Sequence, residues 1–224
     1  MVVPVRESAS QTLAALLPPA SEGMTSPLMG HVLDTLLAIS AGSEWQMNHA
    51  AMLGLKHIMN NLPAPALTTV LEKVHKRLLE NVLSKDDDVR QVTYIVWQVV
   101  HTIAPLDTTP YSAPLQSRLE TALLSVDDLS GSISGLLALH ALLSSHHVVD
   151  PLPMLQRILL FYRHNLSSVR RNALVCTRKI LNECNRDKLW ASPYAFRVLR
   201  MLMQNLLIEE HEVFLYLMMV VNRN

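Results

Sequence analysis

The stretch from Leu67 to Ile103, LTTVLEKVHKRLLENVLSKDDDVRQVTYIVWQVVHTI, carries two amphipathic helix patterns separated by an acidic turn. The first pattern places apolar residues on one stripe at steps of four, three, four and four: Leu67, Leu71, Val74, Leu78 and Val82. The second repeats the pattern with Val89, Val92, Val96, Val99 and Ile103. Because each helix has only one apolar stripe, such a pair cannot close a core alone and must stack on neighbouring pairs.

The start of the second pattern recurs along the chain at near-constant spacing. Equivalent positions are Val5-Arg6, Met47-Asn48, Val89-Arg90, Leu129-Ser130 and Val169-Arg170, with a weaker match at Val213. The steps between them are 42, 42, 40, 40 and 44 residues. A period of about 40–47 residues with two helices per unit is typical of HEAT and armadillo repeats. The sequence therefore predicts an all-α fold, an α-solenoid of HEAT/armadillo-type helix pairs.

We expect residues 1–224 to form a single repeat array. It would comprise the second helix of a repeat at 4–17, a linker at 18–26, and repeats at about 27–61, 62–105, 110–145, 150–185 and 190–222. Proline, favoured in the first helical turn, marks the first helices at Ser26-Pro27, Ala64-Pro65, Ser112-Ala113-Pro114, Asp150-Pro151 and Ser192-Pro193. The array starts in mid-repeat and ends near a helix from Val213 to Val221 without a polar capping unit, so we expect repeats to continue in both directions.

Composition agrees with stacked helices and limits the possible partners. Half of the residues are hydrophobic, only 5% are aromatic, and there are 6 Gly. The 19 basic and 19 acidic residues balance, which disfavours direct binding to nucleic acid. The uncharged run from Leu129 to Val149 is long enough to span a membrane, but its Ser, His and Gly residues favour a buried repeat helix. We therefore expect no membrane association and a monomer.

Polar residues stand where the second helices should begin. Ser43-Glu44-Trp45-Gln46 fits a capping box. Asp86-Asp87-Asp88, Asp127-Asp128 and Ser167-Ser168 occupy equivalent positions, where the helix dipole favours negative charge. The acids can be interpreted as helix caps or as a row of acidic loops along one edge, ready for a basic partner. The two interpretations are compatible.

The sequence lacks the common enzyme motifs. It contains no G-x-x-x-x-G-K-[ST], H-E-x-x-H, C-x-x-C or G-x-S-x-G. We therefore predict no catalytic, cofactor-binding or metal site and no cofactor. Cys176 and Cys184 are interpreted as buried packing residues.

Five strings, in order, resemble the HEAT region of one family, the TATA-binding-protein-associated Snf-type ATPases, which remove TATA-binding protein from DNA. SEWQMNHAAMLGLK at 43–56 is similar to that family's W-Q-V-R-H-G-x-L-L-G-L-K segment. The other strings are PVREsasQtL at 4–13, DDDVR at 86–90, DDLS at 127–130 and SSVRrnAL at 167–174. The sequence departs from the pattern at Asn48, where the family has Arg, and at Ala50, where it has Gly.

The resemblance implies a nuclear transcription regulator whose HEAT turns grip TATA-binding protein along one edge. A separate motor, absent from this chain, would hydrolyse ATP, and DNA would be reached only indirectly through the complex. The matched positions imply contact residues Glu44, Trp45, Asp86, Asp87, Asp88, Asp127 and Asp128. We favour a buried stapling role for Trp45, and an inter-repeat structural ladder for Arg6, Arg90 and Arg170.

Two other hypotheses remain open from the residues alone. The period would equally suit a general HEAT scaffold, such as a transport receptor or a phosphatase subunit. An enzyme built on a helical scaffold is the third.

Overall fold

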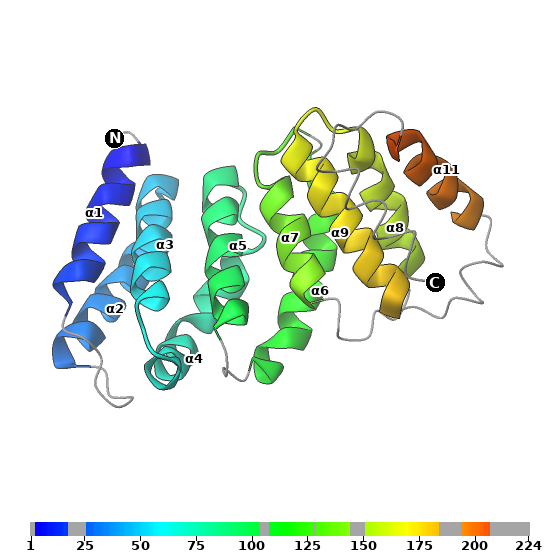
Figure 1. Ribbon diagram of the computed structural model, residues 1–224. Helices are drawn as coiled ribbons and strands as arrows, with labels where there is room; N and C mark the ends of the chain where they lie inside the picture. Colours follow the sequence, from blue (N-terminus) through cyan, green and yellow to red (C-terminus); the bar gives the residue numbers. More distant parts are fainter. Residues whose placement is uncertain are drawn as a thin grey trace. The chain divides into compact units, whose positions relative to one another are not determined.

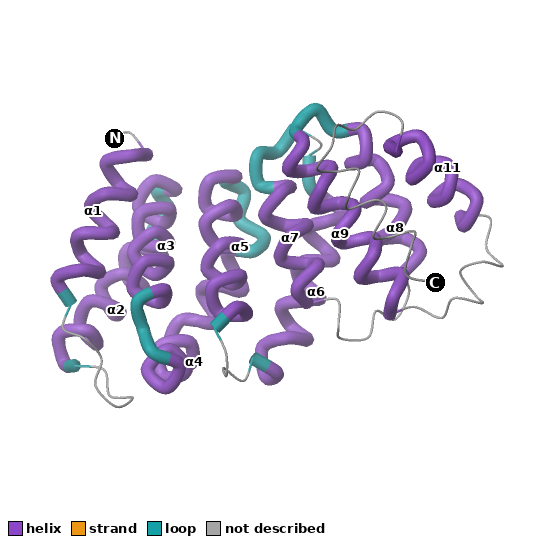
Figure 2. The backbone as a smooth tube through the Cα atoms, viewed as in Figure 1, coloured by secondary structure: helices purple, strands orange, loops and turns teal. Residues whose placement is uncertain are grey.

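The computed structural model describes residues 3–17, 26–103, 108–127, 129–143, 151–183 and 194–206. Several predicted features lie outside these residues: Asp128, Asp150, Cys184, Ser192-Pro193, most of the linker, and the helix from Val213 to Val221. The described residues form helices joined by loops, and no strand occurs among them (Figure 2). They divide into two compact units, Met1–Arg118 and Leu119–Asn224, so the prediction of a single array stays a prediction.

The first unit is built of helices that pack side by side (Figure 1). In chain order they are α1 (Val3–Leu16), α2 (Pro27–Ser40), α3 (Trp45–Asn60), α4 (Ala64–Asn81), α5 (Asp87–Thr102) and the start of α6 (Thr109–Ser125). Helix α3 packs against α1, α2 and α5, while α4 packs against α5 and α2. The second helices of successive pairs are therefore neighbours, as an α-solenoid requires.

The predicted apolar stripes form the core of this unit. Every stripe residue of the first pattern is buried, from Leu67 to Val82. In the second pattern, however, Val99 and the C-cap residue Ile103 are only half-buried, and Trp97 and Val100 of α5 are buried in their place. The buried face of α5 is wider than one stripe because this helix packs against both α3 and α4.

The start of α2 follows the sequence prediction. Ser26 is its N-cap, the Ser26 Oγ accepts a hydrogen bond from the Met29 amide at 3.1 Å, and Pro27 opens the helix.

Two other predicted helix starts are wrong. The N-cap of α3 is Glu44, without a side-chain cap bond, so Ser43 does not form the predicted capping box. Helix α6 begins at Thr109, which places Pro110 in its first turn and Pro114 inside the helix. In both cases several polar or proline residues lie close together in the sequence. The local pattern does not decide at which of them the helix begins.

The described part of the second unit contains further helices and a 3-10 turn. They are α7 (Ile133–Leu143), α8 (Pro151–Leu160), η1 (Phe161–Arg163), α9 (Ser167–Glu183) and α11 (Tyr194–Leu206). Helix α9 packs against α7, α8 and η1, and α11 packs against α8. Leu129 was expected to open a helix, but α7 begins four residues later and Leu129 is 89% exposed. Most residues of α7 are buried, although Leu142 is exposed. None of the described helices is long and apolar enough to cross a membrane.

Candidate partner-binding edge

Within the first unit, the N-terminal ends of α3 and α5 form an edge that carries most of the predicted contact residues. We call it the α3–α5 edge and define it by Arg6, Glu44, Trp45, Met47 and Asp86–Asp88. A cavity of about 600 Å³ opens here, lined by Arg6, Glu44, Gln46, Met47 and Ala50. Glu44, Trp45 and Met47 are exposed, so this edge offers both acidic and apolar surface to a partner.

Arg6 and Trp45 stack at the centre of the edge. The Arg6 guanidinium carbon lies 5.2 Å from the centroid of the Trp45 ring, a favourable cation–π arrangement. Trp45 is 38% exposed, so the expected buried staple is wrong. Trp45 is the first residue of α3, where the Arg6 guanidinium stacks on its ring and part of the indole stays exposed.

His49 links this stack to the core. Its Nδ1 accepts a hydrogen bond from Arg6 Nη1 at 2.9 Å, and its ring meets Trp45 edge-on at 6.4 Å between centroids. Burial lowers the pKa of His49, and the charge of Arg6 lowers it further, against the opposing influence of Asp88 and Asp86. His49 therefore serves as a neutral acceptor that holds the buried Arg6 in place.

The three adjacent acids at the start of α5 have different environments. Asp86 is the N-cap, and its Oδ1 accepts a hydrogen bond from the Val89 amide at 3.2 Å. Asp87 pairs with Arg90 at 2.7 Å. Asp88 is exposed on the surface of the first turn. Capping therefore explains Asp86, whereas Asp88 is the member best placed to meet a partner.

The predicted structural arginines fall into two kinds. Arg90 Nη1 donates to the carbonyl oxygens of Ser84 and Lys85, at 2.7 and 3.2 Å. Arg170 Nη1 makes the same pair of bonds, to the carbonyls six and five residues before it, at 2.8 and 3.0 Å. These bonds close the turn within one repeat, whereas Arg6 reaches a residue of the following repeat. The inter-repeat ladder stays a prediction for Arg90 and Arg170.

Asn48 occupies the arginine position of its repeat and makes a different contact. Its side-chain amide exchanges two hydrogen bonds with that of Asn81, at 3.1 and 3.0 Å. Asn81 is the last residue of α4, so the amide pair joins α3 to the helix pair that follows. Arg90 and Arg170 close a turn within their own repeats, whereas Asn48 makes a bond between repeats.

In the second unit, Asp127 supports a turn rather than a helix start. Its Oδ1 accepts a hydrogen bond from the Leu129 amide at 2.9 Å, and the turn presents the exposed Leu129 side chain. Asp128 lies outside the described residues.

Sequence reasoning missed Met47 as part of the edge. The repeat aligns it with Val89 and Val169, which are fully buried, yet Met47 is 45% exposed. Val5, one repeat earlier, is also exposed, at 54%. The sequence signal for the exposure of Met47 is that its two neighbours, Gln46 and Asn48, are polar.

Stacked helix pairs with functional side chains at one edge define an α-solenoid of HEAT type, a class of protein that works by binding other macromolecules along its surface. No family model matches the chain. The fold is similar to that in a crystal structure of the Mot1 N-terminal domain in complex with TBP. The TM-score is 0.68 and the sequence identity is 14%, and the match covers 100% of this chain and 26% of that one.

The relatives of the chain are TATA-binding protein-associated factors. It is 29% identical to human TATA-binding protein-associated factor 172 over 221 residues, and 30% identical to Saccharomyces cerevisiae MOT1 over 253 residues. These matches cover 95% and 97% of the chain but only 12% and 13% of the relatives. The resemblance seen in the five strings is therefore confirmed: the chain is a homologue of one segment of these factors.

Proposed function

We propose that this chain is part of the HEAT array by which a transcription regulator binds TATA-binding protein. The observation that carries the proposal is similarity along nearly the whole chain to factors named for their association with TATA-binding protein. The related fold of a domain crystallised with TBP supports it.

The α3–α5 edge supplies the contact surface in this proposal. Glu44 and Asp88 are exposed and acidic, and Trp45 and Met47 add exposed apolar area to the same edge. Acidic groups around an aromatic anchor suit a basic partner surface, since charge complementarity directs association while the anchor provides binding energy. Asp127 and Asp128, which belong to the second unit, are further proposed contacts. Asp86 and Asp87 would position the edge through the bonds described above.

In the full-length protein, a motor outside this segment would use ATP to dissociate TATA-binding protein from DNA. This segment would be non-catalytic and monomeric, would act in the nucleus, and would meet DNA only through the complex. The chain spans about one eighth of its relatives, so these activities belong to the proposal.

Titration of the purified chain into labelled TATA-binding-protein core at two salt concentrations tests the proposal. We expect saturable binding that weakens at the higher salt concentration. Glu44→Gln with Asp88→Asn should weaken binding about tenfold and flatten its salt dependence. Glu72→Gln, at an exposed acid on α4 away from the edge, is the control for each replacement made singly and should leave binding unchanged.

Absence of binding by a chain that circular dichroism shows to be folded would overturn direct contact by this segment. Retention of a nuclear-import GTPase or a phosphatase catalytic subunit instead would favour the general scaffold.

A further inference from the structure

The neutral charge of the whole chain conceals a basic segment in the second unit. Residues 151–183 and 194–206 contain eight basic residues and one acidic residue, Glu183. The basic residues are Arg157, Arg163, Arg170, Arg171, Arg178, Lys179, Arg197 and Arg200. An excess of this size creates a local positive potential, whatever the net charge of the chain.

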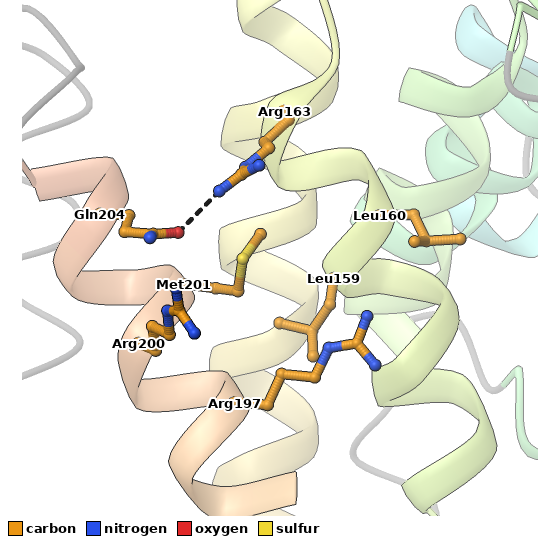
Figure 3. A pocket seen from close by; sticks show the side chains of 7 residues that line it. All are labelled: Leu159, Leu160, Arg163, Arg197, Arg200, Met201 and Gln204. Carbon is orange, nitrogen blue, oxygen red and sulfur yellow. Dashed lines mark hydrogen bonds between the residues drawn. The ribbon is translucent and has the colours of Figure 1, made fainter.

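Three of these arginines surround a cavity of about 270 Å³ between α11 and the segment formed by α8 and η1 (Figure 3). Arg197 and Arg200 come from α11, and Arg163 comes from η1 on the opposite side. Leu159, Leu160 and Met201 supply apolar lining, and Gln204 is the remaining polar residue. Among the residues that the structure describes, no carboxylate lines the cavity.

One arginine of the cavity is held in place and two have open donors. Arg163 Nη2 donates to Gln204 Oε1 at 2.7 Å, which fixes the guanidinium at the mouth of the cavity. Among the described residues, the structure gives Arg197 and Arg200 no hydrogen bond and no ion pair. They lie three residues apart on α11 and so project from adjacent turns of one helix. Like charges this close repel one another, and a bound anion would remove the repulsion.

The chemistry of the cavity selects the kind of anion. A guanidinium binds a carboxylate or a phosphate through two parallel hydrogen bonds. The leucine and methionine lining is of no use to a duplex backbone, which presents charged phosphates and sugars. A peptide that carries an apolar side chain beside its carboxylates would use both parts. The volume lies below the roughly 300–1,000 Å³ of small-molecule sites, so it suits one or two side chains of a peptide.

We propose that this cavity binds an acidic peptide segment of a partner protein, with carboxylates on Arg197 and Arg200 and an apolar side chain against Leu159 and Met201. Arg163, held by Gln204, completes the positive rim. The site lies in the second unit, uses none of the residues of the α3–α5 edge, and goes beyond the binding of TATA-binding protein proposed above.

Fluorescence anisotropy with a labelled peptide of repeated Glu-Glu-Leu units tests the proposal on the full chain at about 150 mM salt. We expect saturable binding that falls at least tenfold with Arg197→Gln/Arg200→Gln. Arg178→Gln/Lys179→Gln removes the same charge from α9 without touching the cavity, so it should change binding less than about threefold. Replacing Leu by Ser in the peptide should also weaken binding, because the apolar contact is lost.

Three results would overturn the proposal. Equal weakening by the two double variants would mean that binding follows the general basic charge. Equal binding of the Leu and Ser peptides would show that the apolar lining is not used. Displacement of the peptide by duplex DNA at lower concentration would assign the arginines to phosphate. Circular dichroism of each variant establishes that it is folded, and unchanged binding to TATA-binding protein keeps this test separate from that of the proposed function.

Discussion

At the scale of single residues, three consecutive aspartates show that identical side chains can serve different purposes. Asp86 satisfies an amide that has no partner within the helix, Asp87 neutralises the arginine that closes the turn, and Asp88 faces solvent. The string DDD allows caps and contacts together but does not assign either role to a particular aspartate. Only the path of the turn assigns each carboxylate its environment.

Replacing these aspartates one at a time should separate stability from binding. Asp86→Ala should lower the free energy of unfolding by about 1 kcal/mol, the usual effect of losing an N-cap. Asp88→Ala should change it by less than about 0.5 kcal/mol, as exposed substitutions do, yet weaken binding to TATA-binding protein. Urea unfolding followed by circular dichroism, together with the binding titration, measures both. Equal destabilisation by the two variants would contradict these separate roles.

At the scale of helices, Gly54 sets how closely α3 approaches α2. A Cβ at this position would lie 3.1 and 3.2 Å from the two δ-carbons of the buried Leu36. At Gly30, inside α2, a Cβ would meet nothing within 4 Å. Two helical glycines therefore differ only in what surrounds them.

Gly30→Ala and Gly54→Ala form a matched pair. Alanine favours a helix over glycine by about 0.8–1.0 kcal/mol, so Gly30→Ala should stabilise the chain by roughly that amount. Gly54→Ala should lose that gain to the contact with Leu36, and the larger Gly54→Leu should destabilise by more than about 2 kcal/mol through overpacking. Thermal and urea unfolding measure all three. Equal stabilisation by the two alanine variants would show that α3 and α2 are free to move apart.

Helix α7 is joined to its neighbours by a buried histidine. Nδ1 of His140 lies 3.5 Å from the Cys176 sulfur, and Nε2 lies 3.2 Å from the Met154 sulfur, so the ring lies between α8 and α9. Burial lowers the pKa of His140 to about 4, against the weaker effect of a backbone hydrogen bond. Burial also raises the pKa of the Cys176 thiol, which stays protonated and unreactive.

His140 should make the chain sensitive to acid. Its folded-state pKa lies below the ordinary value of 6.5, so its stabilising contribution is complete above pH 6.5 and is lost as the pH falls toward 4. The expected slope is about 1.4 kcal/mol per pH unit. Urea unfolding at several pH values should show this slope in the native chain and a smaller one in His140→Gln. Identical slopes would mean that His140 is not the group responsible.

At the scale of the whole molecule, the chain forms two compact units, while the sequence period runs through both. Repeat arrays derive their stability from nearest-neighbour contacts, so a perturbation spreads only as far as those contacts are strong. Whether the chain unfolds as one array or as two units therefore depends on how strongly the two units stabilise each other.

Hydrogen exchange of the Gly54→Leu variant tests this coupling. If the predicted single array is correct, amides in α7 and α9 should lose protection together with those in α3, because the whole chain opens as one cooperative unit. If protection falls in residues 1–118 alone, the prediction of a single array is wrong. Peptide-resolved mass spectrometry distinguishes the two results.

The sequence by itself determined the helical class, the repeat period, the buried stripe from Leu67 to Val82 and the relationship to TATA-binding protein-associated factors. These features depend on periodicity and on ordered strings, which are local properties of the chain. The tertiary structure decided that Trp45 is exposed and stacks on the buried Arg6, that Met47 is exposed where its counterpart Val89 is buried, and which aspartate is available to a partner. It also brought Arg163 together with Arg197 and Arg200, which follow it in the chain by 34 and 37 residues. Periodicity identifies the face of a helix that is buried, but exposure at the helix ends and charges that converge across helices depend on which neighbours pack there.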